Sequence, residues 1–468
     1  MRATNLPAAF YTPPRPVYSA ERLGLRQFLR AARTNALLIW PDAAYERDVL
    51  VNRFLRRTRM LINTPEAIHR VLVENTGNYR RTPAAIRILR PVTGYGVLLS
   101  EGDSWRHQRR TIAPSMAPRV IPMLARHIAA VAQETVASLS RRSNAPLNLL
   151  HEMQFAALEI AGRSMFSLEM AAFGPEMRDL LTGYGLRLSQ PHLLDMLLPP
   201  SIPAPRDFAR WRFQRRWMAL VDRIIDARLP SGENGAPRDL FDLLRAARDP
   251  ETGAAFTREQ LRDQVATMIV AGHETTAIAL FWSLYLIAHA PGWQDAIAAE
   301  TAGLDLGPGG GPAALASLVK TRAVVSEALR LYPPAFTMMR VAIGPDRAGD
   351  LEIPRGAVLM IAPWVLHRHR RLWRDPDAFD PSRFLPGASP PPQRYAYLPF
   401  GAGPRICVGA QFAMAEATLV LAALVQAFRI ALIGDQEVMP RPVVTTQPDR
   451  APDFILSARG SRYTSEAI

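Results

Sequence analysis

The chain has 468 residues, 48% of them hydrophobic, so it can bury a large core, while its length leaves the number of domains open. A net charge of +14 and a pI near 10.6 first suggest a nucleic acid or another acidic partner. However, Lys320 is the only lysine, the arginines are scattered, and no helix-turn-helix, RNP or zinc-finger pattern accompanies them. We therefore expect no binding to nucleic acid.

The chain contains a single cysteine, which excludes an internal disulfide. No N-terminal stretch has the pattern of a secretory signal, and the longest apolar runs fall short of the roughly 20 residues that a membrane span requires. We expect a cytoplasmic protein without a transmembrane anchor. Residues 23–40 mix arginines with apolar residues and favour an amphipathic surface helix, with contact to a membrane surface as the alternative.

Helical patterns dominate the chain, and strand-like pieces such as residues 57–65 and 351–363 are short. We expect a mainly α fold with small β-sheets. Proline-rich breaks and the glycine run at residues 307–312 interrupt the pattern, but none is long enough to be an interdomain linker.

Residues 257–292 predict a long central helix. Thr257 and Gln260 fit a capping box, Pro291 supplies the stop, and the interior is apolar on nearly every face. The sequence AGHETT, residues 271–276, places a glycine and a glutamate inside this helix, and both are unfavourable there.

Two interpretations of AGHETT remain open. In one, Gly272 thins the helix beside a bound group while Glu274 and Thr275 manage protons; in the other, the segment is a buried polar kink with satisfied hydrogen bonds. A zinc peptidase is excluded, because Ala277 stands where HExxH requires its second histidine.

Glu327 and Arg330 lie three residues apart on one helical face, in an apolar context that predicts partial burial. A buried ion pair needs further partners to offset desolvation, and Arg383 is a candidate.

Cys407 lies in the loop FGAGPRICVG, residues 400–409, directly before a strong helical pattern whose N-terminus would stabilise a thiolate. A lone cysteine is most often a small buried hydrophobe, a catalytic one would need an identifiable histidine base, and a zinc site would need more thiolates. A haem iron needs only one axial thiolate, which best explains a single cysteine.

With these motifs, the chain resembles a cytochrome P450 along nearly its whole length. We expect one domain over residues 1–468, with an N-terminal extension over about residues 1–35. Three motifs carry the resemblance: the haem-binding signature FxxGxRxCxG, the ExxR pair, and the oxygen-activation segment of the central helix. The matching residues are Phe400, Gly403, Arg405, Cys407 and Gly409; Glu327 and Arg330; and Ala271, Gly272, Glu274, Thr275 and Thr276. The resemblance implies the P450 fold, with the long central helix over the haem.

The resemblance also implies how the haem is held. Trp105 and Arg109 match a segment that binds one haem propionate, and Arg340 stands where a second propionate arginine is usual. Together with Arg405, these guanidinium groups would pair with the two carboxylates. Phe400 and Gly409 would frame the haem beside Cys407.

Two segments depart from the family pattern. Pro381-Ser382-Arg383-Phe384 replaces the usual PERF but keeps the arginine expected to complete the Glu327/Arg330 network. HRHRRLW, residues 367–373, lacks a usual proline, and we expect a surface turn there. Residues 80–105 are expected to cover the substrate pocket, with their arginines on the surface and contact with a substrate carboxylate as the alternative.

By resemblance, Cys407 would be the axial ligand of haem b, and Glu274 and Thr275 would deliver protons while one oxygen atom of O2 enters the substrate. Apolar residues at Met268, Ile269 and Ala271 and at positions 336–339 suggest a hydrophobic small molecule. Electrons would come from a separate ferredoxin or flavodoxin with its reductase, because no flavin or iron–sulfur domain follows. We expect a soluble, bacterial-type monomer.

Three other functions remain alternatives. The same haem-thiolate centre could use peroxide for oxygenation or catalyse an isomerisation, although the Glu274/Thr275 pair favours dioxygen. A non-catalytic haem-binding sensor is a second alternative, and a thiol hydrolase without haem is the third.

Overall fold

The computed structural model describes residues 11–16, 27, 30–31, 34–54, 57–189, 194–195, 198–199, 201–228, 237–435 and 437–459. Of residues 23–40, expected to form a surface helix, 23–26, 28–29 and 32–33 lie outside these ranges, as does most of the expected N-terminal extension. At the C-terminal end of this stretch, Ala36–Ile39 form a short 3-10 helix, and Leu37 and Trp40 are buried. Within that extension, Tyr11 forms a β-bridge with Phe379, so this part of it is tied to the rest of the protein.

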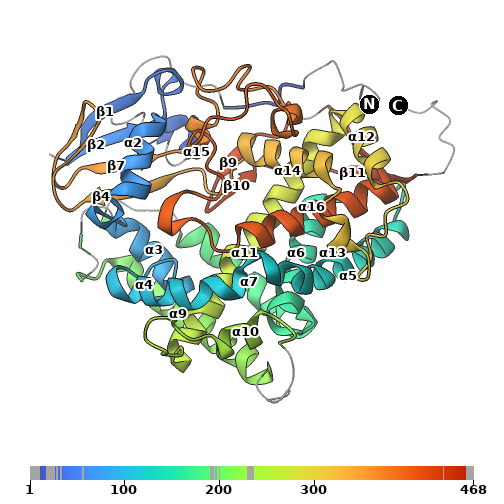
Figure 1. Cartoon of the computed structure of the whole chain (residues 1–468), viewed down its shortest axis with the longest axis horizontal. Coiled ribbons are helices and arrows are strands. Elements are labelled where there is room, and N and C mark those ends of the chain that lie inside the picture. The colour runs from blue at the N-terminus through green and yellow to red at the C-terminus, as the bar shows by residue number, and fades with distance from the viewer. Residues whose placement is uncertain are drawn as a thin grey trace.

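Helices make up most of the described chain, as expected (Figure 1). They are α2 (Pro65–His69), α3 (Pro83–Thr93), α4 (Gly102–Ile112), α5 (Ile121–Ser140), α6 (Leu149–Phe166), α7 (Gly174–Arg187), α9 (Pro205–Arg228), α10 (Leu240–Ala246), α11 (Arg258–Ala288), α12 (Pro291–Thr301), α13 (Gly311–Ala314), α14 (Val319–Leu331), α15 (Pro363–Leu366) and α16 (Ala410–Ala427).

The strands are short and form small sheets, also as expected. They are β1 (Val49–Phe54), β2 (Arg57–Ile62), β3 (Tyr79–Arg80), β4 (Met338–Ala342), β5 (Asp346–Ala348), β6 (Leu351–Ile353), β7 (Val358–Ile361), β8 (Phe428–Leu432), β9 (Pro440–Pro442), β10 (Thr446–Pro448) and β11 (Phe454–Ala458). A five-stranded sheet has the order β1-β2-β7-β4-β3, with β2 and β7 parallel, and lies at one end of the molecule in Figure 1. The pairs β5/β6, β8/β11 and β9/β10 are antiparallel.

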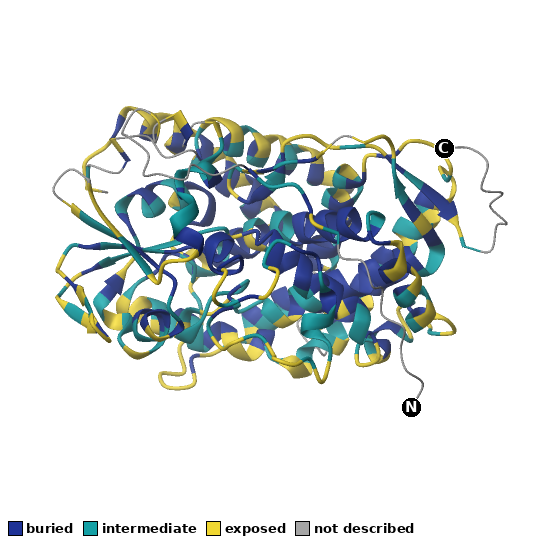
Figure 2. Ribbon diagram, turned by 90° about the horizontal axis from the view of Figure 1, so that it is seen from above, coloured by how far each residue is buried: buried dark blue, intermediate teal, exposed yellow. Residues whose placement is uncertain are grey.

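Helix α11 forms the centre of the core and packs against α3, α6, α9, α14 and α16. Its predicted capping box is confirmed: the Gln260 N–H donates to the Thr257 side chain, and the Thr257 N–H donates to the Gln260 side chain. Pro291, predicted as the stop, is the first residue of α12. Figure 2 shows the buried residues concentrated in these central helices.

Two of the described helices, α11 and α16, are long and apolar enough to cross a membrane. In each, 67% of the apolar stretch is buried inside the protein. A buried core helix has the same composition as a membrane span, so these stretches are weak evidence for one.

The Glu327–Arg330 pair of α14 is completely buried and fully hydrogen-bonded. The Arg330 guanidinium donates to both Glu327 carboxylate oxygens, each at 2.7 Å, and to the carbonyls of His367, Pro376 and Ala378 at 2.6–2.8 Å. These carbonyls lie in the segment that follows α15, so the arginine holds this segment against α14.

The Glu327 carboxylate has further donors in the same segment. It accepts the Asp380 N–H at 2.8 Å, and the Arg383 Nε lies 3.6 Å from its Oε1. Arg383 therefore adjoins the pair, where the sequence places it. These added contacts offset the cost of taking two charges out of water.

The surface turn expected over residues 367–373 is wrong for its two histidines, since His367 and His369 are 0% and 1% exposed. His367 Nε2 accepts the Leu398 N–H at 2.8 Å, and its Nδ1 lies 3.1 Å from the Arg330 carbonyl, so the ring links two backbones. Burial, together with the charge of Arg330, lowers the pKa of His367 to about 3, which keeps the ring neutral.

We predict that Arg330→Met lowers the free energy of unfolding by about 3–5 kcal/mol, because it leaves Glu327 as a buried, unpaired charge. Denaturation in urea measures this change. Arg347→Met is the matched control. Arg347 is 67% exposed and lies 3.7 Å from Asp350, so this substitution should change the free energy of unfolding by no more than about 0.5 kcal/mol. Equal midpoints for the two variants would contradict the prediction.

Candidate active site

The loop over residues 400–409 holds Cys407 in a defined backbone frame. The Cys407 N–H donates to the Phe400 carbonyl at 2.9 Å, and the Ile406 N–H donates to the Gly403 carbonyl at 3.0 Å. Helix α16 begins at Ala410, three residues after the thiol, as the sequence predicts. The loop therefore presents the sulfur at the start of a helix.

Two glycines shape this loop in different ways. Gly401 and Gly403 both have positive φ, at 74° and 70°. A Cβ on Gly403 would lie 1.9 Å from the Leu72 carbonyl oxygen, whereas one on Gly401 would meet only the Met338 sulfur at 3.6 Å. Only the absence of a side chain lets the loop pass so close to the Leu72 backbone.

The Cys407 side chain is exposed, yet protein atoms surround it closely enough to affect its ionisation. Burial raises the pKa of the Cys407 thiol, while the Gly409 N–H and the Arg109 guanidinium act in the opposite direction. Both opposing groups stabilise a negative sulfur, so a thiolate would find an N–H donor and a cation in place.

A cluster of guanidinium groups lies in the same region. Arg405 forms an ion pair with Glu101, donates to the Ser100 carbonyl at 3.1 Å, and stacks over the Trp105 ring at 4.4 Å. Trp105 and Arg109 both belong to α4, for which Glu101 is the N-cap. The structure thus brings together the predicted Trp105, Arg109 and Arg405.

Arg340 belongs to the same cluster, and so does Arg81, which the sequence analysis missed. Burial, followed by repulsion from Arg340 and Arg405, lowers the pKa of Arg81 to about 9. Burial and repulsion from Arg405 also lower the pKa of Arg340, and Glu101 is the one carboxylate that opposes these shifts. The cluster therefore carries more positive than negative charge.

Arg81 reaches this position through long-range strand pairing. Strand β3 pairs with β4 in the register Arg80↔Val341, which sets Arg81 beside Arg340. No local sequence pattern reports a contact across about 260 residues. The expectation that arginines in residues 80–105 lie on the surface is also wrong for Arg87, which is 6% exposed and donates to Asp207 at 2.7 Å.

The residues present fit a haem. Cys407 offers one thiolate ligand, and Arg109 lies near it. Arg81, Arg340 and Arg405 face a single carboxylate, Glu101, and this excess of positive charge suits a ligand bearing two carboxylates. The Nε of Arg81 is buried without a hydrogen-bond partner in the part of the chain that the structure describes. Such a donor indicates that this surface is built for an acceptor other than the protein's own groups.

The AGHETT segment lies in the middle of α11. Glu274 Oε1 accepts hydrogen bonds from Thr445 Oγ1 at 2.9 Å and from Gln447 Nε2 at 2.5 Å, two donors at β10 that the sequence analysis missed. Thr275 Oγ1 donates to the Ala271 carbonyl at 2.6 Å, so its lone pairs are left to accept. Glu274 and Thr275, which are consecutive on α11, are therefore both hydrogen-bonded.

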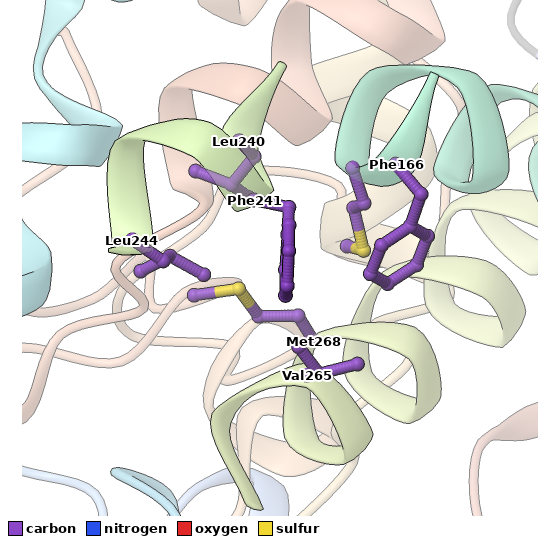
Figure 3. Close-up of a pocket in the computed structure, with 7 residues that line it drawn as sticks. Phe166, Leu240, Phe241, Leu244, Val265 and Met268 are labelled. Carbon is purple, nitrogen blue, oxygen red and sulfur yellow. The ribbon is translucent and has the colours of Figure 1, made fainter. Parts of the chain in front are cut away.

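Two of the residues expected to contact substrate belong instead to the core. Met268 and Ile269 are 7% and 2% exposed, and Met268 packs among apolar side chains of α6, α10 and α11. Figure 3 shows this packing around Phe166, Leu240, Phe241, Leu244, Val265 and Met268. Ala271 is exposed, although α11 is buried over residues 263–269 and 276–287. Between these two buried stretches, the accessible residues 270–275 include all of the AGHETT segment except Thr276.

Comparison with known proteins agrees with this geometry. The family model "Cytochrome P450" matches residues 45–451. The chain is 34% identical to cyclooctatin synthase from Streptomyces melanosporofaciens over 81% of this chain and 82% of that protein. It is 32% identical to cyclooctat-9-en-7-ol 5-monooxygenase from the same organism, over 73% of this chain and 74% of that protein. It is 31% identical to cytokinin hydroxylase from Arabidopsis thaliana, over 78% of this chain and 72% of that protein.

The fold also matches a solved structure. The crystal structure of the haem domain of cytochrome P450DA superposes with a TM-score of 0.76, at 23% sequence identity, over 96% of this chain and 98% of that one. This match shows the fold alone.

We predict that Gly403→Ala is much more damaging than Gly401→Ala. Both variants place a side chain at positive φ, which lowers the free energy of unfolding by about 1–2 kcal/mol. Only Gly403→Ala adds a collision with a backbone carbonyl, which lowers it by about 1–3 kcal/mol more. The urea midpoint and the haem content of the purified proteins measure the difference. Equal losses in the two variants would show that the Leu72 contact does not constrain the loop.

Proposed function

The chain belongs to the cytochrome P450 family and is a monooxygenase, and from this premise we propose that it inserts one oxygen atom of O2 into a hydrophobic small molecule, by hydroxylation or epoxidation. We propose haem b as the cofactor, which supplies an iron centre that binds dioxygen and transfers one of its atoms. The observation that carries the proposal is a cysteine held at a helix start beside an arginine cluster with one carboxylate.

In this proposal, Cys407 ligates the iron as a thiolate. The Gly409 N–H and the Arg109 charge stabilise the negative sulfur against the effect of burial. The arginines hold the two propionates, and Trp105 orients Arg405 by stacking. Arg81 joins Arg109, Arg340 and Arg405 in this role.

Glu274 and Thr275 are proposed to control protons. Both donors to Glu274 bind Oε1, so within the described residues Oε2 has no hydrogen bond and is the atom able to carry a proton. The Thr275 hydroxyl, anchored on the Ala271 carbonyl, would accept hydrogen bonds from water. This arrangement supports dioxygen over peroxide as the oxidant, because only dioxygen needs protons delivered to it.

The proposed electron donor is a separate ferredoxin or flavodoxin with its reductase. Such carriers are acidic, and a chain with a net charge of +14 would attract them at long range. Reconstitution with acidic carriers at increasing salt tests this point, since electrostatic attraction weakens as salt rises.

The relatives support a small-molecule substrate. Their names describe a synthase of cyclooctatin, a monooxygenase of cyclooctat-9-en-7-ol and a hydroxylase of cytokinins. At 31–34% identity these names give the reaction class, while the substrate of this chain is proposed only as hydrophobic. The accessible residues at positions 336–339 and Ala271 are the ones expected to contact it.

We predict that the dithionite-reduced protein with carbon monoxide shows the strongly red-shifted Soret band of a thiolate-ligated haem. Cys407→Ala should lose this band, since it removes the only thiol of the chain. The absorption spectrum measures both. A wild-type spectrum with haem but without the shift would overturn the assignment of Cys407 as the ligand.

We predict that Thr275→Ala keeps the haem and the red-shifted band but releases more of the consumed electrons as hydrogen peroxide. A general acid–base group typically raises the rate of the catalysed step about 10²–10⁴-fold, so product formation should fall by at least about tenfold. Thr275→Ser, which keeps the hydroxyl, should recover most of the coupling. Peroxide released per electron consumed is the measurement, and normal coupling in Thr275→Ala would rule out this role for Thr275.

A further inference from the structure

The irregular segment between α3 and α4, residues 94–100, is bonded through its backbone to α11. The Tyr95 N–H donates to Asp263 Oδ2 at 2.8 Å, and the Val97 N–H donates to Gln264 Oε1 at 2.9 Å. Two polar side chains of α11 therefore satisfy backbone donors of a segment that lies outside the helices and sheets.

The segment also lies directly against the backbone of α11. A Cβ on Gly96 would lie 2.1 Å from Thr267 Oγ1 and 2.7 Å from the Asp263 carbonyl oxygen, so only glycine permits this approach. Thr267 Oγ1 also donates to the Thr93 carbonyl at 3.2 Å, directly before the segment. The start of the segment is therefore fixed on α11 by several independent contacts.

Gln264 links the same segment to α4. Its Nε2 donates to Gln108 Oε1 at 2.8 Å, and Gln108 Nε2 donates to the Tyr95 carbonyl at 3.1 Å. Ser100 Oγ donates to the same Gln108 oxygen at 3.2 Å. We call the contact between the two glutamine side chains the Gln108–Gln264 bridge. It joins α4, segment 94–100 and α11.

The polar side chains of this network are buried, which favours a single arrangement. Ser100, Gln108, Asp263, Gln264 and Thr267 are each 0–5% exposed. A buried group that loses its hydrogen-bond partner is costly, and hydrogen bonds depend on direction, so small displacements of the segment are unfavourable. Apolar packing alone would tolerate such displacements more easily.

The position of the segment adjoins the accessible stretch of α11. Residues four apart on a helix are neighbours on one face, so Thr267 neighbours Ala271, and Ala271 neighbours Thr275. Ala271 is exposed, and its carbonyl accepts the Thr275 hydroxyl. The face of α11 that segment 94–100 covers therefore continues directly into the face that carries Thr275.

The other end of the segment reaches the cysteine loop. Arg405 of that loop donates to the Ser100 carbonyl at 3.1 Å. Segment 94–100 thus runs from the central helix to the loop that holds Cys407. Since the proposed haem lies between this helix and this loop, the segment passes along one side of the space where the reaction occurs.

We propose that Gln108 and Gln264 are positioning residues that hold segment 94–100 as one wall of the substrate pocket. This inference rests on the proposed function, because the pocket is defined by the haem that Cys407 would ligate. The bridge acts on the substrate only through the segment, and it holds the wall in place before the substrate arrives. A preformed wall lowers the cost of ordering on binding and keeps bulk water away from Thr275.

The first experiment is a titration of the holoprotein with 4-phenylimidazole, an azole that ligates haem iron and fills space above it. Gln264→Leu keeps a similar side-chain volume but removes both hydrogen bonds of residue 264. Because the closed position of the wall is then less populated, the apparent Kd should rise about fivefold or more. The shift of the Soret band measures binding, and the carbon monoxide band shows that thiolate ligation is retained.

Gln294→Leu is the matched control for the loss of a buried glutamine. Gln294 of α12 is 3% exposed, donates to the Ile287 and Ile430 carbonyls and accepts the Ile430 N–H, at 2.8–3.0 Å. This variant should lower the urea midpoint about as much as Gln264→Leu while leaving the Kd of the azole unchanged. An equal rise of the Kd in both variants would reduce the bridge to a general contribution to stability and contradict the proposal.

Hydrogen–deuterium exchange locates the effect in the chain. In Gln264→Leu, the amides of segment 94–100 should exchange at least about tenfold faster than in the wild type, because the Val97 N–H loses its acceptor. In Gln294→Leu they should exchange as in the wild type. Ser100→Ala removes only one hydrogen bond to Gln108, so this milder variant should change exchange and azole affinity in the same direction by smaller factors.

The two measurements separate this proposal from the proposed function. Exchange requires neither haem nor turnover, so it tests the attachment of the segment even if the carbon monoxide spectrum contradicts thiolate ligation. Unchanged exchange in Gln264→Leu would show that the bridge does not hold the segment. Faster exchange with unchanged azole affinity would show that the segment is not a wall of the pocket, and either result would overturn the proposal.

Discussion

The buried ion pair between Glu327 and Arg330 is the interaction on which the arrangement of the site depends. Two charges at 0% exposure are tolerable only because the guanidinium satisfies three backbone carbonyls and the carboxylate gains the Asp380 N–H and the nearby Arg383. These carbonyls and donors belong to the segment between α15 and the cysteine loop. The pair thus supplies hydrogen-bond partners to the backbone of an irregular stretch. The same hydrogen bonds offset the desolvation cost of the two charges.

The same segment leads to Cys407 through His367. Its neutral ring bridges the Arg330 carbonyl and the Leu398 N–H, so the chain enters the cysteine loop from a fixed point. Gly403 then allows the loop to approach the Leu72 backbone more closely than any other residue would. The position of the sulfur therefore follows from a series of backbone contacts and requires no contact made by the thiol itself.

Electrostatics divide the molecule into two kinds of positive region. Around Arg81 and Arg340 the guanidiniums are buried, repel one another and have lowered pKa values, which favours a dianionic ligand at a defined place. In the groove between α7 and α9, Arg187, Arg212, Arg215 and Arg216 are instead exposed to solvent. Neither of these regions has the pattern of a nucleic-acid site.

The sequence by itself determined the features that depend on local spacing. The capping box and length of α11, the loop around Cys407, the Glu327/Arg330 pair with Arg383, and the mainly α architecture all follow from residue order and periodicity. Only the tertiary structure decided which groups meet across the chain. It placed Arg81 beside Arg340 through the β3–β4 pairing, gave Glu274 its donors from the β10 region, buried His367 and Arg87, and returned Met268 to the core. Burial and charge compensation arise from contacts between segments that are far apart in the sequence. Local sequence patterns do not predict such contacts, because periodicity and spacing reflect only neighbouring residues.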